Sequence, residues 1–151
     1  GGDFVASAVA AIASYKMPCV IIEIGTAVAM GILDKNANYI GGVIAPGPRV
    51  SQEALARGAA LLPNVSVTPT AAVIAKTTAT SMQSGIVNGS AAMIDGLLER
   101  IEGELGETVS AVAAGDWAET IIPHCRRKDI VIDNDILMHG LWDIYKKNRR
   151  N

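Results

Sequence analysis

Residues 17–33 read MPCVIIEIGTAVAMGIL, and this stretch decides the fold class. Its first part, 17–24, is a short apolar run rich in β-branched residues, which predicts a buried strand. A glycine–threonine pair makes a turn, and 28–33 predicts a second strand. After a turn rich in Asp and Asn, 39–44 predicts a third. Three short strands joined by tight turns indicate an antiparallel meander.

The elements around this meander alternate between helix and strand. The longest is a helix expected at 78–105, where apolar residues recur at helical spacing. Its glycines, such as Gly85 and Gly89, fit either close packing within the chain or a dimer interface. The other expected elements are helices at 3–15 and 51–62, a short helix after Gly115 ending at Ile122, a last helix capped by Asp133 or Asn134 and ending near Lys147, and strands at 72–75, 109–113 and 130–132. The pattern predicts a mixed α/β fold.

The composition limits the classes of protein to which the chain can belong. Of 151 residues, 50% are hydrophobic, 19% are charged and only 4% are aromatic. This predicts one domain, or one lobe of a larger protein, with an aliphatic core, and it excludes a disordered chain. The net charge of −2 argues against nucleic-acid binding, which depends on neutralising phosphates. The basic residues at 126–128 and 146–150 are expected to be solvated.

The cysteines and the apolar runs indicate in which cellular compartment the protein is expected. Cys19 and Cys125 have neither metal-ligand spacing nor a disulfide framework, and Cys19 lies in an apolar run, which predicts a reduced core residue. No apolar stretch reaches the ~18 residues of a membrane span, and the first residues do not follow the signal-peptide pattern. We therefore expect a cytoplasmic protein with no membrane association.

The segment Glu23-Ile24-Gly25-Thr26 combines groups suited to binding phosphate. Glycine lets a phosphate approach the backbone, and the threonine hydroxyl and amide can bond it. An acidic side chain at the end of a strand can hold the balancing cation. The same residues also suit a plain turn between two strands.

Three other segments allow both a structural and a chemical role. Asp3, behind Gly1 and Gly2, could cap a helix or accept a proton from a substrate hydroxyl. The run GGVIAPG at 41–47 places two glycines within a strand, which predicts a bulge or the close approach of a ligand. Thr78 is a natural N-cap and could also present its hydroxyl to a ligand.

Together these motifs resemble those of the type III pantothenate kinases, the family that includes the Bvg accessory factor proteins. Gly1-Gly2-Asp3-Phe4 resembles the family's Gly-x-Asp-Arg motif, and 23–27 resembles its Asp-x-Gly-Thr-Ala motif. The Gly-Gly-x-Ile-x-Pro-Gly motif is intact at 41–47. Residues 77–85 resemble Asn-Thr-x-x-x-Met-Gln-Ser-Gly, and 114–116 resemble a late Thr-Gly-Gly motif. The resemblance covers essentially the whole chain.

The resemblance implies the actin-like ATPase fold of the acetate kinase, sugar kinase and Hsp70 superfamily, in which two ribonuclease-H-like lobes hold ATP between them. Residues 1–16 would be a linker helix carrying the substrate motif, and 17–151 would be the C-terminal lobe. The family's N-terminal lobe, with its Asp-x-Gly-Asn phosphate loop, has no counterpart in this sequence. A segment outside these residues, or a separate subunit, would supply that lobe.

The reaction implied is transfer of the γ-phosphoryl group of ATP to pantothenate, the first step of coenzyme A synthesis. The implied cofactors are magnesium and a monovalent cation, potassium or ammonium. By position, Asp3 would be the general base and Glu23 the metal ligand. Gly25, Thr26 and Gly115 would contact ATP.

The resemblance also implies a substrate pocket and an assembly. Gly1, Gly2 and Phe4 would line the pantothenate pocket. Thr78 would reach it from a neighbouring protomer, across a homodimer or heteromer interface formed by helix 78–105.

Four positions depart from the family pattern. Phe4 stands where the family has arginine, Glu23 replaces an aspartate, and Ala114 and Asp116 replace a threonine and a glycine. Three functions therefore stay open. The first is the C-terminal part of a pantothenate kinase, inactive alone, and the second is a catalytically inactive Bvg accessory factor-like binding protein. A related kinase with another hydroxylated substrate is a third.

Overall fold

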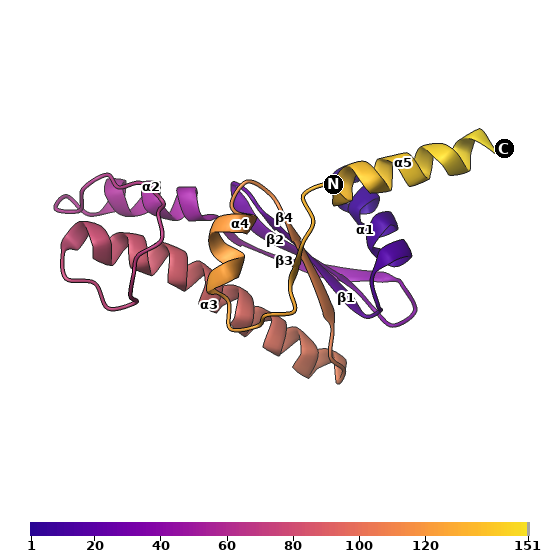
Figure 1. The fold of residues 1–151 in the computed structure, drawn as a ribbon, viewed down its shortest axis with the longest axis horizontal. Helices are drawn as coiled ribbons and strands as arrows, with labels where there is room; N and C mark the ends of the chain where they lie inside the picture. The colour runs from indigo at the N-terminus through magenta and orange to yellow at the C-terminus, as the bar shows by residue number, and fades with distance from the viewer. Residues whose placement is uncertain (151) are drawn as a thin grey trace.

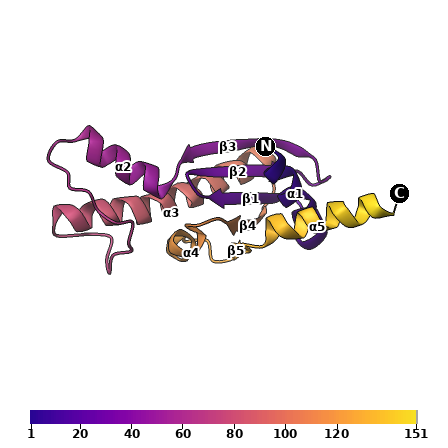
Figure 2. The same cartoon turned by 90° about the horizontal axis from the view of Figure 1, so that it is seen from above.

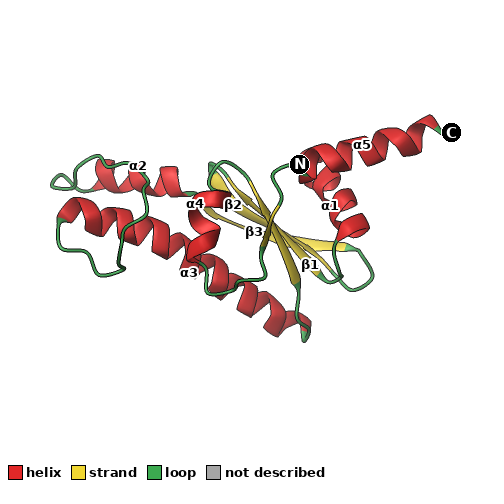
Figure 3. Ribbon diagram, viewed as in Figure 1, coloured by secondary structure: helices red, strands yellow, loops and turns green. Residues whose placement is uncertain are grey.

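The computed structural model describes residues 1–150 as one sheet with helices on both faces (Figures 1 and 3). The five strands lie in the order β3-β2-β1-β4-β5. The elements are α1 (Gly2–Ser14), β1 (Cys19–Ile24), β2 (Ala27–Leu33), β3 (Tyr39–Pro46), α2 (Pro48–Gly58), α3 (Thr78–Leu105), β4 (Ser110–Ala114), α4 (Ala118–Ile121), a 3-10 turn (Ile122–His124), β5 (Val131–Ile132) and α5 (Ile136–Arg149).

The meander predicted from the sequence is confirmed. β1 pairs antiparallel with β2, and β2 pairs antiparallel with β3. The chain then crosses over through α2 and α3 and returns as β4, which runs parallel to β1; β5 runs parallel to β4. β1 is therefore central, with an antiparallel neighbour on one side and a parallel neighbour on the other.

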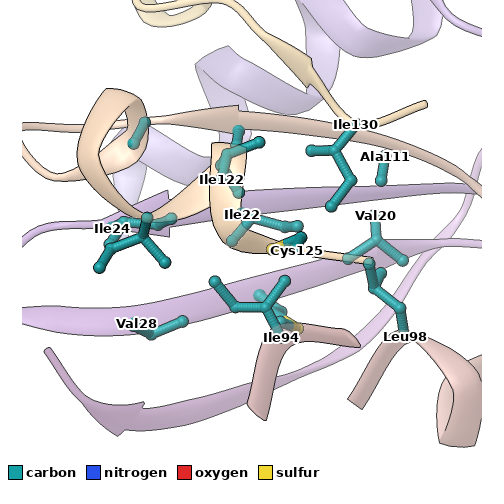
Figure 4. Close-up of a cluster of buried hydrophobic side chains, with 14 of the residues drawn as sticks. Val20, Ile22, Ile24, Val28, Ile94, Leu98, Ala111, Ile122, Cys125 and Ile130 are labelled. Carbon is teal, nitrogen blue, oxygen red and sulfur yellow. The ribbon is translucent and has the colours of Figure 1, made fainter. Parts of the chain in front are cut away.

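Alternation along β1 divides the core into two layers. Val20, Ile22 and Ile24 are fully buried against α3, chiefly Ile94 and Leu98 (Figure 4). Cys19 and Ile21 point to the opposite face, where α1 and the start of α5 cover them. Cys19 is a buried free cysteine, as the sequence predicted. Burying an aliphatic side chain of this size contributes about 1.5–3 kcal/mol, so both layers fix β1 firmly.

Helices α1 and α5 cross at a single glycine. Gly140 is buried, and a Cβ added to it would collide with the backbone of Ala6 in α1. Beyond the crossing, Tyr15 donates a hydrogen bond of 3.1 Å to Asp133, just before α5. Burial beside Asp133 raises the pKa of Tyr15 to about 12. Figure 2 shows α5 alongside α1 and then extending away from the sheet.

The expected N-caps of three helices were wrong, although α3 spans the expected residues 78–105. α2 begins at Pro48 rather than Ser51, because proline is preorganised for the first helical position. α3 is capped by Thr77 rather than Thr78: the Thr77 hydroxyl accepts from the Thr80 amide at 3.2 Å in a capping box. α5 follows Asp135, whose amide donates to the carboxylate of Asp133.

Other local predictions also need correction. Asp3 does not cap α1, since Gly1 is the N-cap and Asp3 lies within the first turn. α2 ends at Gly58 rather than near 62. The strand expected at 72–75 is absent from the described chain: the Val73 carbonyl accepts from Ser84 Oγ at 2.5 Å, so a side chain takes the place of a strand partner.

The double glycine of β3 forms the predicted bulge. Leu33 pairs with Tyr39, whereas the next residue of β2, Ile32, pairs with Gly41, which leaves Ile40 as the extra residue. Gly41 has a φ of 147°, a conformation that favours glycine. Among residues 1–150, no helix has the length and apolarity required to cross a bilayer.

The α1–α5 crossing gives a stability prediction. Replacing Gly140 by Ala should destabilise the fold by about 1–3 kcal/mol, because the new methyl group has no room against Ala6. Replacing Gly103 in α3 is the matched control: its Cβ position is open, so alanine should stabilise the helix by up to ~1 kcal/mol. Chemical denaturation of the two variants measures both changes in the free energy of unfolding. Equal changes would contradict the close packing of α5 against α1 at Gly140.

Candidate active site

The candidate site is built around the carboxylate at the end of β1. Glu23 follows the alternation of β1 onto the face covered by α1, but it lies beside the first turn of that helix and is exposed. Its two neighbours across the sheet are Ala29 in β2 and Ala114 in β4. Both have small side chains, so neither fills the space next to Glu23 along the sheet.

The loop after β4 wraps closely around Glu23. Gly115 has a φ of 111°, and a Cβ there would lie 2.7 Å from Glu23 Oε1 and 2.6 Å from the carbonyl oxygen of Ile24. Only glycine lets this loop pass so close to the acidic side chain. The Gly115 amide donates to Asn134 Oδ1 at 3.1 Å, which ties the loop to the segment before α5.

Gly47, the residue directly after β3, contacts the turn between β1 and β2. Gly47 donates its amide to the carbonyl oxygen of Thr26 at 3.0 Å, and a Cβ on Gly47 would collide with the backbone of 25–26. The GGVIAPG run predicted to approach a ligand therefore also shapes this turn. Gly25 borders the Glu23 carboxylate, while Thr26 is exposed.

The first turn of α1 brings Asp3 to the same place. Asp3 is exposed, and an acidic residue is favourable at the N-terminus of a helix. The ring of Phe4 turns inward instead and packs over Gly31 in β2, where a Cβ would lie 2.9 Å from two ring carbons. Tyr39 covers the same glycine.

The charges of two nearby aspartates act on the Glu23 carboxylate. Partial burial of its carboxylate raises the pKa of Glu23 above the ordinary value of 4.5, and the negative charges of Asp116 and Asp3 raise it further. The three groups come from the end of β1, the loop after β4 and the start of α1. Excess negative charge of this kind attracts a cation.

Two cavities meet at Glu23. One, of about 310 Å³, is lined by Glu23, Gly115, Asp116 and Asn134. The other, of about 360 Å³, is lined by Gly1, Gly2, Asp3, Phe4 and Ser7 as well as by Glu23. Leu137, in the first turn of α5, lines both. The geometry provides adjoining compartments with an acidic group between them.

The residues fit a cation that takes most of its ligands from elsewhere. Within residues 1–150, no group of three His, Cys, Asp or Glu side chains is close enough to hold a metal ion by itself. Mg²⁺ usually retains waters and binds one or two carboxylates together with substrate phosphates. Glu23, with alanines on either side in the sheet and the negative charges of Asp116 and Asp3 nearby, suits that partial role.

Thr78 is the one predicted site residue that the chain does not bring to this place. Both views put the start of α3 at the end of the molecule away from the start of α1 (Figures 1 and 2). The Thr78 side chain is exposed there. Of the other predicted residues, those that line a cavity with Glu23 are Gly1, Gly2, Asp3, Phe4 and Gly115, and Gly25 borders its carboxylate. Thr26 is exposed in the β1–β2 turn and lines neither cavity.

Sequence reasoning missed several residues of the cavities, among them Ser7, Asn134 and Leu137. Ser7 is buried and lies four residues after Asp3, so helical spacing could have placed both on one side of α1. Asn134 was considered only as a helix cap, and Leu137 only as part of a helix. No local signal marks either one, because the strand order brings α5 to the site.

Comparison with solved structures defines the class of fold. A conserved Baf family protein from Campylobacter jejuni superposes with a TM-score of 0.69 at 16% identity, covering 100% of this chain and 66% of that one. The activator of the 2-hydroxyisocaproyl-CoA dehydratase from Clostridium difficile, solved with bound ADPNP, gives 0.62 at 17% identity, covering 98% and 68%. The chain is a lobe of the actin-like ATPase fold.

Sequence comparison defines the family. The profile of the type III pantothenate kinases matches residues 1–100. The type III pantothenate kinase of Shouchella clausii is 40% identical over 99% of this chain, and that of Syntrophus aciditrophicus is 36% identical over 98%. The chain belongs to the type III pantothenate kinase family. It spans 58% of the length of each of these two relatives.

The carboxylate cluster gives a titration prediction. Replacing Asp116 by Asn should lower the pKa of Glu23, which burial and Asp3 will still hold above 4.5. A carboxyl group whose pKa is higher in the folded than in the unfolded state makes the free energy of unfolding fall as pH rises between those two pKa values. The Asp116→Asn variant should therefore lose less stability than the parent protein between them. Carbon-13 NMR of the Glu23 carboxyl measures the shift. Glu119→Gln is the control, and an equal shift there would contradict the pairing.

Proposed function

We propose that this chain is the C-terminal part of a type III pantothenate kinase, which phosphorylates pantothenate with ATP once a second lobe completes the site. The observation that carries the proposal is the pair of adjoining cavities that share Glu23. One cavity suits a phosphorylated donor and the other suits an acceptor. Family membership supplies the reaction type.

In this proposal, Asp3 takes the proton of the substrate hydroxyl. It lines the acceptor cavity, so a primary hydroxyl bound there lies within reach of its carboxylate. The hydroxyl oxygen forms a bond to the γ-phosphorus as the bond to the β-phosphate oxygen breaks. The hydroxyl proton passes to Asp3, and the products are ADP and 4'-phosphopantothenate.

In this proposal, Glu23 would hold a cation between donor and acceptor. Magnesium, or a monovalent cation such as potassium or ammonium, supplies charge neutralisation for the phosphates when bound. The role of Glu23 is to fix that charge at the boundary of the two cavities, where its carboxylate has alanines on both sides.

The donor cavity is suited to phosphate through its backbone. Gly115 leaves the loop after β4 without a side chain at its closest point to Glu23. Gly25, in the β1–β2 turn, borders the Glu23 carboxylate, and the exposed Thr26 beside it would offer a hydroxyl from outside the lining of this cavity. The Gly115 amide already donates to Asn134 Oδ1 and the Gly25 amide to the carbonyl oxygen of Ala27, so these glycines would admit a phosphate through the space that they leave, and the Thr26 hydroxyl would be the donor.

The acceptor cavity is small and has one apolar wall. Gly1 and Gly2 leave its rim open, Ser7 offers a buried hydroxyl, and Phe4 forms part of the lining. Since the arginine of the family motif is replaced by Phe4, the substrate carboxylate loses a charged contact from this position. Thr78 of a neighbouring protomer would close the pocket, in a homodimer or heteromer joined through α3.

An inactive, Bvg accessory factor-like binding protein is the second candidate. The specific observation in its favour is Asp116, which lines the donor cavity. Its negative charge also raises the pKa of Glu23. A carboxylate at that position repels the phosphates that a kinase must bind. Such a protein would keep the acceptor cavity and the interface while losing phosphoryl transfer.

Replacing Asp3 by Asn tests the catalytic role in the protein completed by its second lobe. The isosteric amide cannot accept the proton, so kcat should fall by about 10²- to 10⁴-fold, while KM for pantothenate stays nearly constant. Steady-state kinetics measure both constants. Asp135→Asn, an exposed aspartate at the start of α5, should keep full activity; a similar loss there, or no loss at Asp3, would contradict the role.

Replacing Phe4 by Arg tests the substrate. If pantothenate occupies the acceptor cavity, the new guanidinium gains a charge-assisted contact, and KM for pantothenate should fall by roughly 10-fold or more. The comparison is pantothenate against its neutral primary alcohol, pantothenol. Equal changes for both compounds would show that the carboxylate does not lie near this position.

A further inference from the structure

The donor cavity, which Gly115 and Asp116 line, offers a phosphate very few hydrogen-bond donors. Its lining includes three carboxylates, those of Glu23, Asp116 and Glu119. Apart from Asn134, the other lining residues are alanine, glycine, isoleucine and leucine. Among the residues of 1–150 that line this cavity, Asn134 is therefore the one whose side chain carries N–H groups.

The hydrogen bond that Asn134 makes fixes the orientation of its carboxamide. Its Oδ1 accepts from the Gly115 amide at 3.1 Å, and only the oxygen of a carboxamide can accept such a bond. The side chain is exposed, and its Nδ2 donates to no atom of residues 1–150. Both N–H groups of Nδ2 are therefore available to a molecule in the cavity.

The segment that carries Asn134 is held by hydrogen bonds to its neighbours. The amide of Asp133 donates to the carbonyl oxygen of Ala113 in β4 at 2.8 Å. The Asp133 carboxylate accepts from the Tyr15 hydroxyl in α1 and from the Asp135 amide, both at 3.1 Å. A group that is held in place before a ligand arrives loses little conformational entropy on binding.

The loop that carries Gly115 is held in a similar way. The Gly115 carbonyl oxygen accepts from the Ala118 amide at 3.1 Å, and the Trp117 amide donates to the carbonyl oxygen of Ile24 at 3.0 Å. Asn134 adds the bond to the Gly115 amide. The carboxamide thus occupies a backbone donor at the edge of the cavity and brings its own N–H groups to the same place.

We propose that Asn134 is a nucleotide-binding residue, whose Nδ2 donates to a phosphate oxygen of ATP in the donor cavity while its Oδ1 holds the Gly115 amide. The proposal rests on the proposed function, which places ATP there. Carboxylates repel phosphate oxygens and aliphatic side chains have no N–H group, which leaves the carboxamide as the side chain on this lining that can bind phosphate directly. A hydrogen bond to an ionised acceptor is roughly twice as strong as one between neutral groups.

Two substitutions separate binding of phosphate from support of the loop. Asn134→Asp keeps an oxygen for the Gly115 amide and removes Nδ2, whereas Asn134→Leu, which has a similar shape, removes both. In the protein completed by its second lobe, the Kd for ATP should rise by about 10-fold or more in both variants. Amide hydrogen exchange at Gly115, measured without nucleotide, should become faster only in Asn134→Leu.

Two controls exclude an effect of charge and an effect elsewhere in the protein. Salt screens repulsion between exposed charges, so a loss of affinity caused only by the new carboxylate of Asn134→Asp would disappear at high salt. We expect the loss to persist there, and to be present at every salt concentration in the neutral Asn134→Leu. Asn36→Asp, a matched change at an exposed position in the turn between β2 and β3, should alter neither ATP binding nor exchange at Gly115.

Three results would overturn the proposal. They are unchanged ATP affinity in Asn134→Asp, an equal loss of affinity for adenosine, which has no phosphate, and a parent protein that does not bind ATP. Pantothenate turnover on the same samples separates this claim from the proposed function. Turnover with unchanged ATP affinity in both variants contradicts the role of Asn134 alone, and the expected losses of affinity without turnover in the parent contradict the kinase function alone.

Discussion

The alternation of side chains along β1 is the constraint on which the rest of this structure depends. Three aliphatic residues of β1 pack against α3 and fix the strand in the core. Because side chains alternate along a strand, the residue between the last two of them must point to the opposite face, which α1 covers. That residue is Glu23. A shift of one residue would bury its charge under α3, at a cost that no neighbouring group could offset. The stability of the sheet therefore also fixes the direction of the acidic group.

Small residues then determine what can reach that group. Alanines flank Glu23 on both sides, Gly115 allows the β4 loop to pass close to it, and Gly47 holds the turn that follows it. A larger side chain at Gly115 or Gly47 would collide with backbone that borders the site. The site is thus an opening left in an otherwise aliphatic fold, with α1 and α5 as its walls.

Sequence patterns predicted the parts of this fold that depend on neighbours along the chain. The meander, the long helix and the bulge at Gly41 followed from periodicity and glycine placement. The strand expected at 72–75 failed because Ser84, eleven residues away, bonds the Val73 carbonyl. Leu137 and Asn134 could not be assigned to the site, since only the placement of α5 beside β4 brings them to Glu23.

The direct test of the central claim is phosphoryl transfer from ATP to pantothenate, measured on the protein isolated from its own cells together with its intact mass. The account predicts that 4'-phosphopantothenate is formed by a species containing these residues and a second lobe, and that the 151 residues alone do not form it. Turnover by the 151 residues alone would contradict the account. So would a two-lobed protein that binds both substrates and transfers nothing.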